Sequence, residues 1–295
     1  MAFDPKLIDK IYNAFDPFEP LEPGNPAYVE CGKVRGDSNI EQDLGRKIVR
    51  ADSPTCQLYA GHRGAGKSTE LLRLKKYLGE NQCFVVYFSA DKEDIDSEDA
   101  QYTDILLACT RHLLEELRNQ NPAPILNWLK DRWQELKDLA LTTVELDKLD
   151  VQVAIATFGK ITANLRAVPT QRAEIRKLVE PHTTKLLKAL NEFIDQAQQK
   201  LPDGKTKLVI IADSLDRITP TIQEDGRTNH DHIFIERSQQ LKGLNCHVVY
   251  TLCLTHNYGK DCHDCTLIIK ELEKLKKCNP GQKKNLKTLI YQIKD

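Results

Sequence analysis

Three features typical of membrane or exported proteins are missing from this 295-residue sequence. No apolar run is long enough to span a bilayer, and the N-terminus carries acidic residues without the apolar stretch of a signal peptide. A disulfide framework is not indicated either, because the nine cysteines are odd in number and several lie in apparent core strands, namely Cys56, Cys83 and Cys246. We therefore expect a cytoplasmic protein with reduced thiols and no membrane partner.

An excess of positive charge is missing as well. Lysine and arginine together number 42 against 43 aspartates and glutamates, which gives a formal net charge of -1. Bulk charge therefore gives no argument for nucleic-acid binding, although local basic patches leave a nucleic-acid partner open. With 40% hydrophobic and 29% charged residues, the chain has the composition of a globular protein, long enough for one large α/β domain or two small ones.

A glycine-rich loop is the most informative stretch that the sequence does contain. It matches the pattern G-x-x-x-x-G-K-[ST] and consists of Gly61, His62, Arg63, Gly64, Ala65, Gly66, Lys67, Ser68 and Thr69. Glycines let the backbone curl around a polyanion, so that successive N–H groups and the start of a helix point at it. In that arrangement Lys67 reaches the β- and γ-phosphates of a nucleotide, and the Ser68 hydroxyl binds Mg²⁺.

The flanks of this loop have the structure that the motif requires. Residues 57–60 form a short, mostly apolar run that suits a buried strand, and leucines at helical spacing follow the loop, at Leu71, Leu72, Leu74 and Leu78. A glycine turn before an ordinary helix is the plain alternative. A strand, a glycine loop and a helix in this order favour a phosphate-binding loop.

A second apolar segment, residues 207–213, ends in Asp213, and Asp216 follows it closely. If the segment is a parallel strand of the same sheet, Asp213 lies at the edge where ligands bind and can hold Mg²⁺, while Asp216 can orient an attacking water. The alternative is a buried strand that ends in a helix-capping aspartate. The expected strand at 246–252 carries Thr251 near its end, where the hydroxyl either contacts the γ-phosphate or water, or belongs to an ordinary β-branched strand residue.

Together, the loop at 61–69, the segment at 207–216 and the strand ending at Thr251 resemble the additional-strand class of P-loop NTPases. More narrowly, they resemble AAA+ ATPases and their STAND relatives over roughly residues 28–255. The spacing of Asp213 and Asp216 is similar to that of STAND proteins, whereas AAA+ motors have adjacent Asp-Glu. The resemblance implies an α/β three-layer sandwich with a mostly parallel sheet in the order 5-1-4-3-2, and ATP and Mg²⁺ as ligands.

The expected domain organisation has three parts. Residues 1–30 form an N-terminal helix and a proline-rich linker, residues 31–255 a P-loop ATPase domain, and residues 256–295 an atypical C-terminal tail. The tail is too short for the helical lid of such families, but its run at 288–293 can supply a fifth strand.

An insertion at about 121–200 separates the two halves of the expected site. Apolar and polar residues alternate over 141–168, most clearly at 151–155, which predicts a β-hairpin. A long helix is expected over 172–199, with a kink or a break at Pro181. The acidic loop at 91–99 is expected to be solvated surface, with a place near the site as the alternative.

Phosphoryl transfer needs positive charge beyond Lys67 and Mg²⁺, and Arg217 and Arg237 are the candidates. The resemblance places Arg237 where AAA+ proteins often carry an arginine finger for a neighbouring subunit, although either arginine can equally be a surface residue. We therefore predict a nucleotide-driven ATPase switch that self-associates or binds a protein partner. The alternative is an ATP-binding regulatory scaffold with little hydrolysis that acts through protein or nucleic-acid partners. A small-molecule kinase ranks behind both, because no acceptor pocket or lid arginine is evident.

Two residue pairs have the spacing of zinc ligands, Cys253-x-x-His256 and Cys262-x-x-Cys265. The gap between the pairs is short and Cys253 falls at the end of an expected strand, so coincidence is the better explanation. We expect no stoichiometric zinc.

Overall fold

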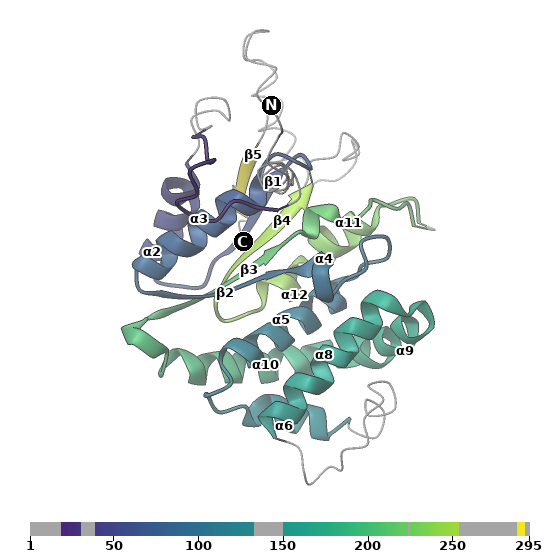
Figure 1. Ribbon diagram of the computed structural model, residues 1–295. Coiled ribbons are helices and arrows are strands. Elements are labelled where there is room, and N and C mark those ends of the chain that lie inside the picture. The colour runs from purple at the N-terminus through teal and green to yellow at the C-terminus, as the bar shows by residue number, and fades with distance from the viewer. Residues whose placement is uncertain (1–18, 31–38, 133–149, 224, 254–287, 293–295) are drawn as a thin grey trace, which may run out of the picture.

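A computed structural model describes residues 19–30, 39–132, 150–223, 225–253 and 288–292 (Figure 1). The N-terminal helix predicted before residue 18 lies outside these ranges, as do three of the four residues with zinc-ligand spacing, namely His256, Cys262 and Cys265. Within the described part, no helix is both long and apolar enough to cross a membrane.

A five-stranded sheet forms the centre of the fold. Its strands are β1 Cys56–Gly61, β2 Cys83–Ser89, β3 Lys207–Asp213, β4 His247–Cys253 and β5 Thr288–Gln292. The spatial order is β2-β3-β4-β1-β5, which is the predicted order 5-1-4-3-2 counted from the other edge. The first four strands are parallel, whereas β5 pairs with β1 in the antiparallel direction. The predicted fifth strand and the mostly parallel sheet are thus confirmed.

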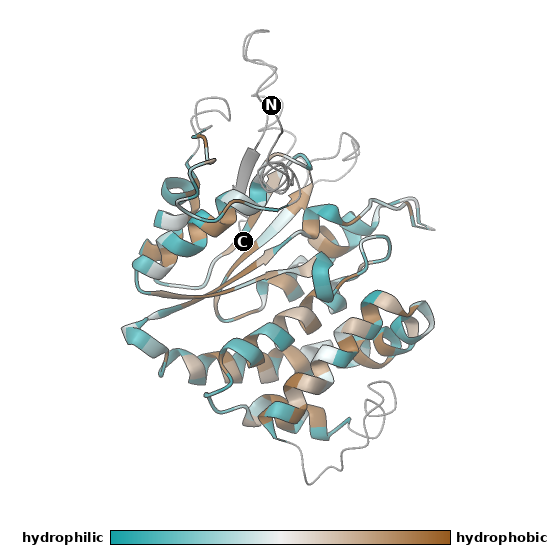
Figure 2. Ribbon diagram, viewed as in Figure 1, coloured by the Kyte–Doolittle hydropathy of each residue, from teal (hydrophilic) through white to brown (hydrophobic). Residues whose placement is uncertain are grey.

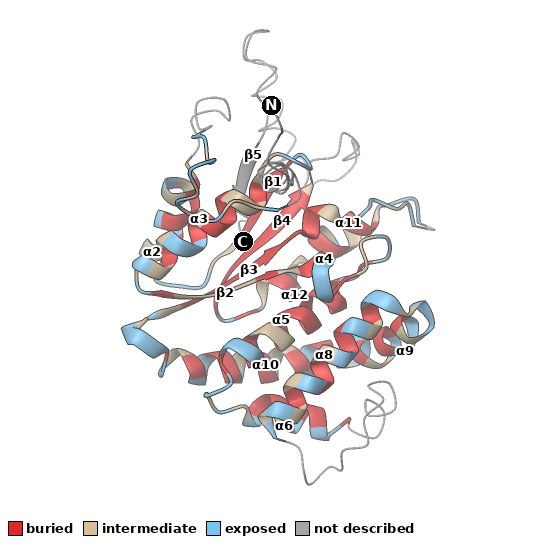
Figure 3. Ribbon diagram, viewed as in Figure 1, coloured by how far each residue is buried: buried red, intermediate tan, exposed pale blue. Residues whose placement is uncertain are grey.

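Helical layers cover both faces of the sheet, and the alternation of side chains in β3 shows how. Val209 and Ile211 pack against one layer, whereas Leu208 and Ile210 pack against the other. The first layer comprises the turn η2 Glu41–Gly45, α2 Arg46–Arg50 and α3 Lys67–Glu80, and the second α5 Tyr102–Glu116, α10 Thr183–Gln198 and α12 Ser238–Lys242. Because both faces are covered, β3 and β4 are mostly apolar and almost completely buried, as their largely brown colour in Figure 2 and red colour in Figure 3 show.

The insertion is helical, and the β-hairpin predicted at its centre is wrong for residues 151–167. These residues form α8 Val151–Ala167, which begins where the Asp150 carboxylate accepts a hydrogen bond of 2.8 Å from the N–H of Val153. Residues 141–149 lie outside the described ranges. The buried stripe of α8 consists of Ala154, Phe158, Ile161 and Leu165, which recur at helical spacing. The helical spacing of this stripe, and not the short alternation at 151–155, is therefore the pattern that predicts the observed helix.

The long helix predicted over 172–199 is broken at Pro181, one of the two outcomes expected for that proline. It consists of α9 Pro169–Val179, the turn η4 Glu180–His182 and α10. The remaining short elements are α4 Ala90–Glu93, α6 Ala123–Lys130, η5 Pro202–Gly204, η6 Leu215–Arg217, α11 Asn229–Asp231 and η7 His232–Glu236.

Candidate functional site

The glycine-rich loop connects β1 to the first turn of α3, as the motif predicts. Gly64 and Gly66 have φ angles of 78° and 80°, a left-handed conformation that only glycine adopts at little cost. The N–H of Ala65 donates to the carbonyl of His62 at 3.1 Å, which closes the loop, and Arg63 is exposed at its rim. The loop therefore directs the start of a helix toward the ligand side of the sheet, which favours an anion.

Lys67 is held at the centre of the candidate site. Its side chain is almost completely buried, and Nζ donates to the carbonyl oxygens of Gly61 at 2.9 Å and His62 at 2.8 Å. The same Nζ lies 2.8 Å from Oδ2 of Asp216, which is 9% exposed. The structure thus brings together the lysine and the aspartate that the sequence assigned to phosphate and to water. A phosphate group bound by Lys67 would compete with this carboxylate.

Asp213 ends β3 at the carboxyl edge of the sheet and is 1% exposed. Burial raises the pKa of its carboxyl, while hydrogen bonds from the hydroxyls of Tyr87 and Ser68 and from the N–H of Ser214 oppose the rise. Ser68 and Asp213, the two predicted Mg²⁺ ligands, are therefore in direct contact. Two oxygen donors at one point, one of them a carboxylate, fit a hard cation such as Mg²⁺.

Tyr87 is a site residue that the sequence reasoning missed. Its phenol donates to Oδ2 of Asp213 at 2.7 Å, and Ser89 of the same strand shares a hydrogen bond of 2.8 Å with Ser214. The predicted strand order already made β2 the neighbour of β3. The hydroxyls near the end of β2 were therefore the signal that could have identified it.

Thr251 is completely buried, and its Oγ1 accepts the N–H of Leu215 at 2.8 Å. That bond fixes the turn after β3, in which Ser214 adopts the left-handed conformation with φ of 64°. The threonine therefore supports the turn that carries Asp216 to Lys67. A contact between Thr251 and a γ-phosphate stays a prediction.

The two candidate arginines line different cavities. Arg217 forms an ion pair of 2.6 Å with Asp91, next to the glycine-rich loop. Arg237 lies 3.2 Å from the Glu180 carboxylate and 5.0 Å above the Tyr102 ring, in a separate cavity of 250 Å³. The side chain of Arg237 is half-exposed, so its role toward a neighbouring subunit stays a prediction.

The acidic stretch at 91–99 is exposed at Glu93, Glu98 and Asp99, as expected for solvated surface, but most of its carboxylates also form ion pairs. Asp94 is completely buried between Arg111 at 2.7 Å and His112 at 2.9 Å. Burial acts to raise its pKa, but the hydrogen bond and charge of His112 and the charge of Arg111 outweigh it, so that the pKa lies below the usual value. Asp91 and Asp96 line a cavity together with Arg63 of the glycine-rich loop, as the alternative expectation had it.

The proline-rich linker runs along α3. The N–H of Leu21 donates to Oγ1 of Thr69 at 3.1 Å, and the hydroxyl of Tyr28 donates to Glu70 at 3.1 Å. The guanidinium of Arg73 lies 4.7 Å from the centre of the Tyr28 ring. The linker therefore contacts the last residue of the motif, on the same helix that carries Lys67.

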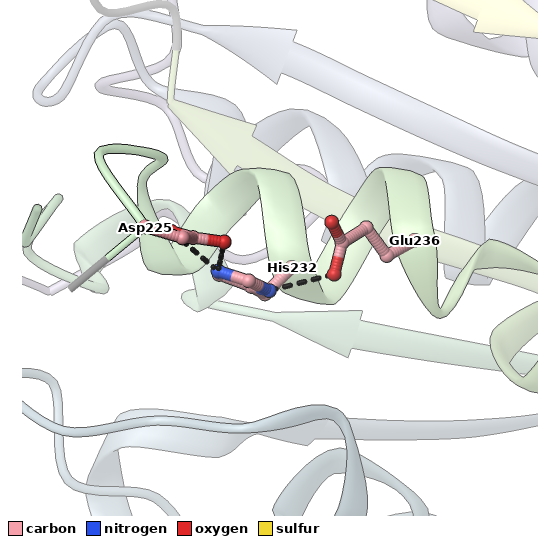
Figure 4. A group of neighbouring side chains, drawn as sticks. All are labelled: Asp225, His232 and Glu236. Carbon is pink, nitrogen blue, oxygen red and sulfur yellow. Dashed lines mark hydrogen bonds and ion pairs between the residues drawn. The ribbon is translucent and has the colours of Figure 1, made fainter. Parts of the chain in front are cut away.

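A separate cluster, which includes two residues of η7, has the composition of a metal site but the bonding of an ion-pair network (Figure 4). Nδ1 of His232 lies 2.7 Å from Glu236, and Nε2 lies 3.2 Å from Asp225, so both ring nitrogens face carboxylates. Arg227 forms ion pairs with the same two carboxylates. Because Arg227 and both ring nitrogens of His232 already engage these carboxylates, we assign no metal to this cluster.

In comparisons with known proteins, residues 46–224 match the family described as the KAP family P-loop domain. The match spans more than half of the chain, from α2 through β3 to the turn beyond Asp216. Neither a curated protein nor a solved structure matches the chain.

Proposed function

This chain belongs to the KAP family of P-loop NTPase domains, and on that premise we propose that it binds ATP with Mg²⁺ and hydrolyses it as a nucleotide-driven switch. The observation that carries the proposal is the convergence of four side chains from two distant segments. Lys67 and Ser68 begin α3, Asp213 ends β3 and Asp216 lies in η6, yet Lys67 contacts Asp216 and Ser68 contacts Asp213.

The roles of these residues follow from their positions. The N–H groups of the loop and the ammonium of Lys67 would bind the phosphates, and Ser68 and Asp213 would hold Mg²⁺. Bound there, Mg²⁺ neutralises charge on the phosphate oxygens. Asp216 would then orient the water that attacks the terminal phosphate.

The ion pair between Lys67 and Asp216 supports a switch. A terminal phosphate attracts the ammonium of Lys67 and repels the carboxylate, so nucleotide binding is expected to separate the two side chains. Because Asp216 lies in η6, the turn anchored by Thr251, its displacement changes the surface next to Asp91 and Arg217. A second copy of the chain or a protein partner that binds only one form of this surface would make the change in nucleotide a switch in assembly.

A regulatory scaffold that binds ATP and hydrolyses it slowly is the second candidate. It is favoured by the sequence Asp213-Ser214, in which the residue after the strand is not the glutamate of AAA+ motors. Measured turnover separates the candidates, since only the first requires sustained release of phosphate. Calorimetric titrations with ATP, GTP and ADP test the binding that both require and determine the base preference.

Substitutions of the two aspartates are expected to have different effects, one on Mg²⁺-dependent binding and the other on turnover. Asp213→Asn should weaken nucleotide binding in the presence of Mg²⁺ but not in its absence, because it removes one charge from the cation's ligands. Asp216→Asn keeps the shape of the side chain and should leave ATP affinity within a few-fold while lowering turnover by about 10²–10⁴-fold. Calorimetry with and without Mg²⁺ and phosphate release measure the two effects. Hydrolysis at the normal rate by Asp216→Asn would show that the water-orienting role is wrong.

Turnover is expected to depend on protein concentration. Arg237 lies in a different cavity from Arg63 and Arg217, so a role at the transition state requires the site of a neighbouring molecule. A dilute sample should therefore bind ATP yet turn over slowly, with an arginine-dependent gain of roughly 10³–10⁵ on assembly. Arg237→Ala should lose this gain, whereas Arg118→Ala, at an exposed arginine after α5, should keep it. High activity that does not change with concentration contradicts the prediction.

A further inference from the structure

A cavity of 340 Å³ beside the glycine-rich loop has walls from four separate parts of the chain. Arg63 comes from the loop, Arg217 from η6 and Arg166 from the last turn of α8, in the insertion. Asp91 and Asp96 complete the charged lining. In Figure 1, α4 lies between the sheet and α8, and it packs against both α8 and η6. The insertion therefore brings a cation to the ligand side of the sheet.

The charges in this cavity are only partly balanced. Asp91 is paired with Arg217 at 2.6 Å, and Asp96 is paired with Arg172 of α9. Arg63 is exposed and has no hydrogen bond or ion pair with any residue that the structure describes. Arg166 is also exposed, and its guanidinium donates to the carbonyl oxygen of Lys92, with no carboxylate partner in the described ranges. Two guanidinium groups thus remain for an anion.

The position of the cavity indicates which anion this is. Arg63 is the third residue of the glycine-rich loop and lies four residues before Lys67. Arg217 directly follows Asp216, whose carboxylate lies 2.8 Å from Nζ of Lys67. Two walls of the cavity therefore come from the two segments that flank Lys67, on the side of Asp216. The part of the linker that the structure describes does not line this cavity. It contacts α3 at Thr69, where the N–H of Leu21 donates to the hydroxyl.

We propose that this cavity receives the terminal phosphate of a bound nucleoside triphosphate, and that Arg63 and Arg166 are cationic ligands of that phosphate in addition to Lys67. The proposal rests on the proposed function, since it concerns the nucleotide held by the same loop. Guanidinium groups present two parallel N–H donors to phosphate oxygens, which makes arginine well suited to this contact. The arginines would then distinguish a triphosphate from a diphosphate. Because Arg166 belongs to α8, its contact with the terminal phosphate would also link the insertion to the bound nucleotide.

The test compares the affinities for ADP and for a non-hydrolysable ATP analogue in the full chain, measured by calorimetry. Arg63→Ala and Arg166→Ala should each weaken the analogue by about 10- to 100-fold, the usual worth of a hydrogen bond to a charged group. For Arg166→Ala, which lies outside the loop, binding of ADP should stay within about twofold, since ADP lacks the phosphate concerned, and for Arg63→Ala the loss for ADP should be smaller than the loss for the analogue. Arg118→Ala is the matched control and should change neither affinity. Because Arg63 and Arg166 are both exposed, thermal melting should remain normal.

Three results of these titrations decide whether the proposed contact with the terminal phosphate exists. Selective loss of affinity for the analogue supports the proposal. Equal loss for both nucleotides, or no loss for either, overturns it, because the arginines then make no contact specific to the terminal phosphate. If the unmodified chain binds neither nucleotide, the proposed function itself has failed, and this result is separate from any difference between variants.

Discussion

Lys67→Ala is expected to lose ATP affinity by a factor on the order of 100 or more, because the ammonium is the one positive side chain held at the centre of the loop. The loop backbone would remain able to face a phosphate, but the charge that neutralises the β- and γ-phosphates would be gone. Calorimetric titration with Mg²⁺ and ATP measures the change. Normal ATP affinity in the folded variant means that the assignment of the phosphate-binding loop is wrong.

A loss of binding by this variant has a second possible cause, which needs its own control. Lys67 is 4% exposed and is paired with Asp216, so the alanine variant leaves a mostly buried carboxylate without a partner. The double variant Lys67→Ala/Asp216→Asn removes both charges and should recover most of the lost melting temperature. ATP affinity should stay low in the double variant, because its loss comes from the missing ammonium. Recovery of affinity together with stability would show that Lys67 matters only for folding.

The parts of the fold that the sequence predicts correctly are those decided by neighbouring residues. The strand, glycine loop and helix around Lys67 and the apolar strand ending in Asp213 are local patterns. Their placement follows because a continuous apolar run must be buried on both faces of a parallel sheet. The β-hairpin predicted for residues 151–167 is wrong for a related reason. Five alternating residues satisfy a period of two, but only a longer window shows the buried stripe that includes Phe158 and Leu165.

The partners of charged residues could not be predicted in the same way. Asp96 and Asp99 belong to a stretch expected to be solvated surface, yet Arg172 and Arg176 reach them from α9, more than 70 residues later. Such pairs depend on how the insertion packs, which is a tertiary property. The cavity containing Arg166 has the same origin, since helical periodicity alone does not indicate what the last turn of α8 faces.

Arg176→Ala is expected to destabilise the fold by about 3–5 kcal/mol, because it breaks a buried ion pair by removing one partner. Asp104 at the start of α5 is 1% exposed and accepts two hydrogen bonds from this guanidinium, at 2.6 Å and 3.1 Å. Burial raises the pKa of Asp104 even with the arginine present. Without Arg176, the ionised carboxylate has no charge partner, and water cannot replace it. Urea unfolding at neutral pH measures the loss.

Arg172→Ala is the matched control for this prediction. Its carboxylate partners Asp96 and Asp99 are partly exposed, so they can be hydrated, and the loss of stability should be smaller. The stability deficit of Arg176→Ala should also depend on pH. Arg176 opposes the rise that burial causes in the pKa of Asp104, so removing Arg176 raises that pKa further, and the folded variant takes up a proton at a higher pH than the folded parent protein. The deficit should then shrink as the pH falls toward the unfolded pKa of about 4.

A deficit that is equal in the two arginine variants, or that does not change with pH, would contradict the account of a buried charge. The outcome also bears on the cavity that holds Arg166. Arg172 and Arg176 tie α9 to the segment between β2 and α5 through Asp96 and Asp99, and the same segment lines the cavity through Asp91 and Asp96. If the network holds the insertion in place, Arg176→Ala should reduce the preference for the ATP analogue over ADP at temperatures where the protein is still folded. That effect would connect the packing of the insertion to recognition of the terminal phosphate.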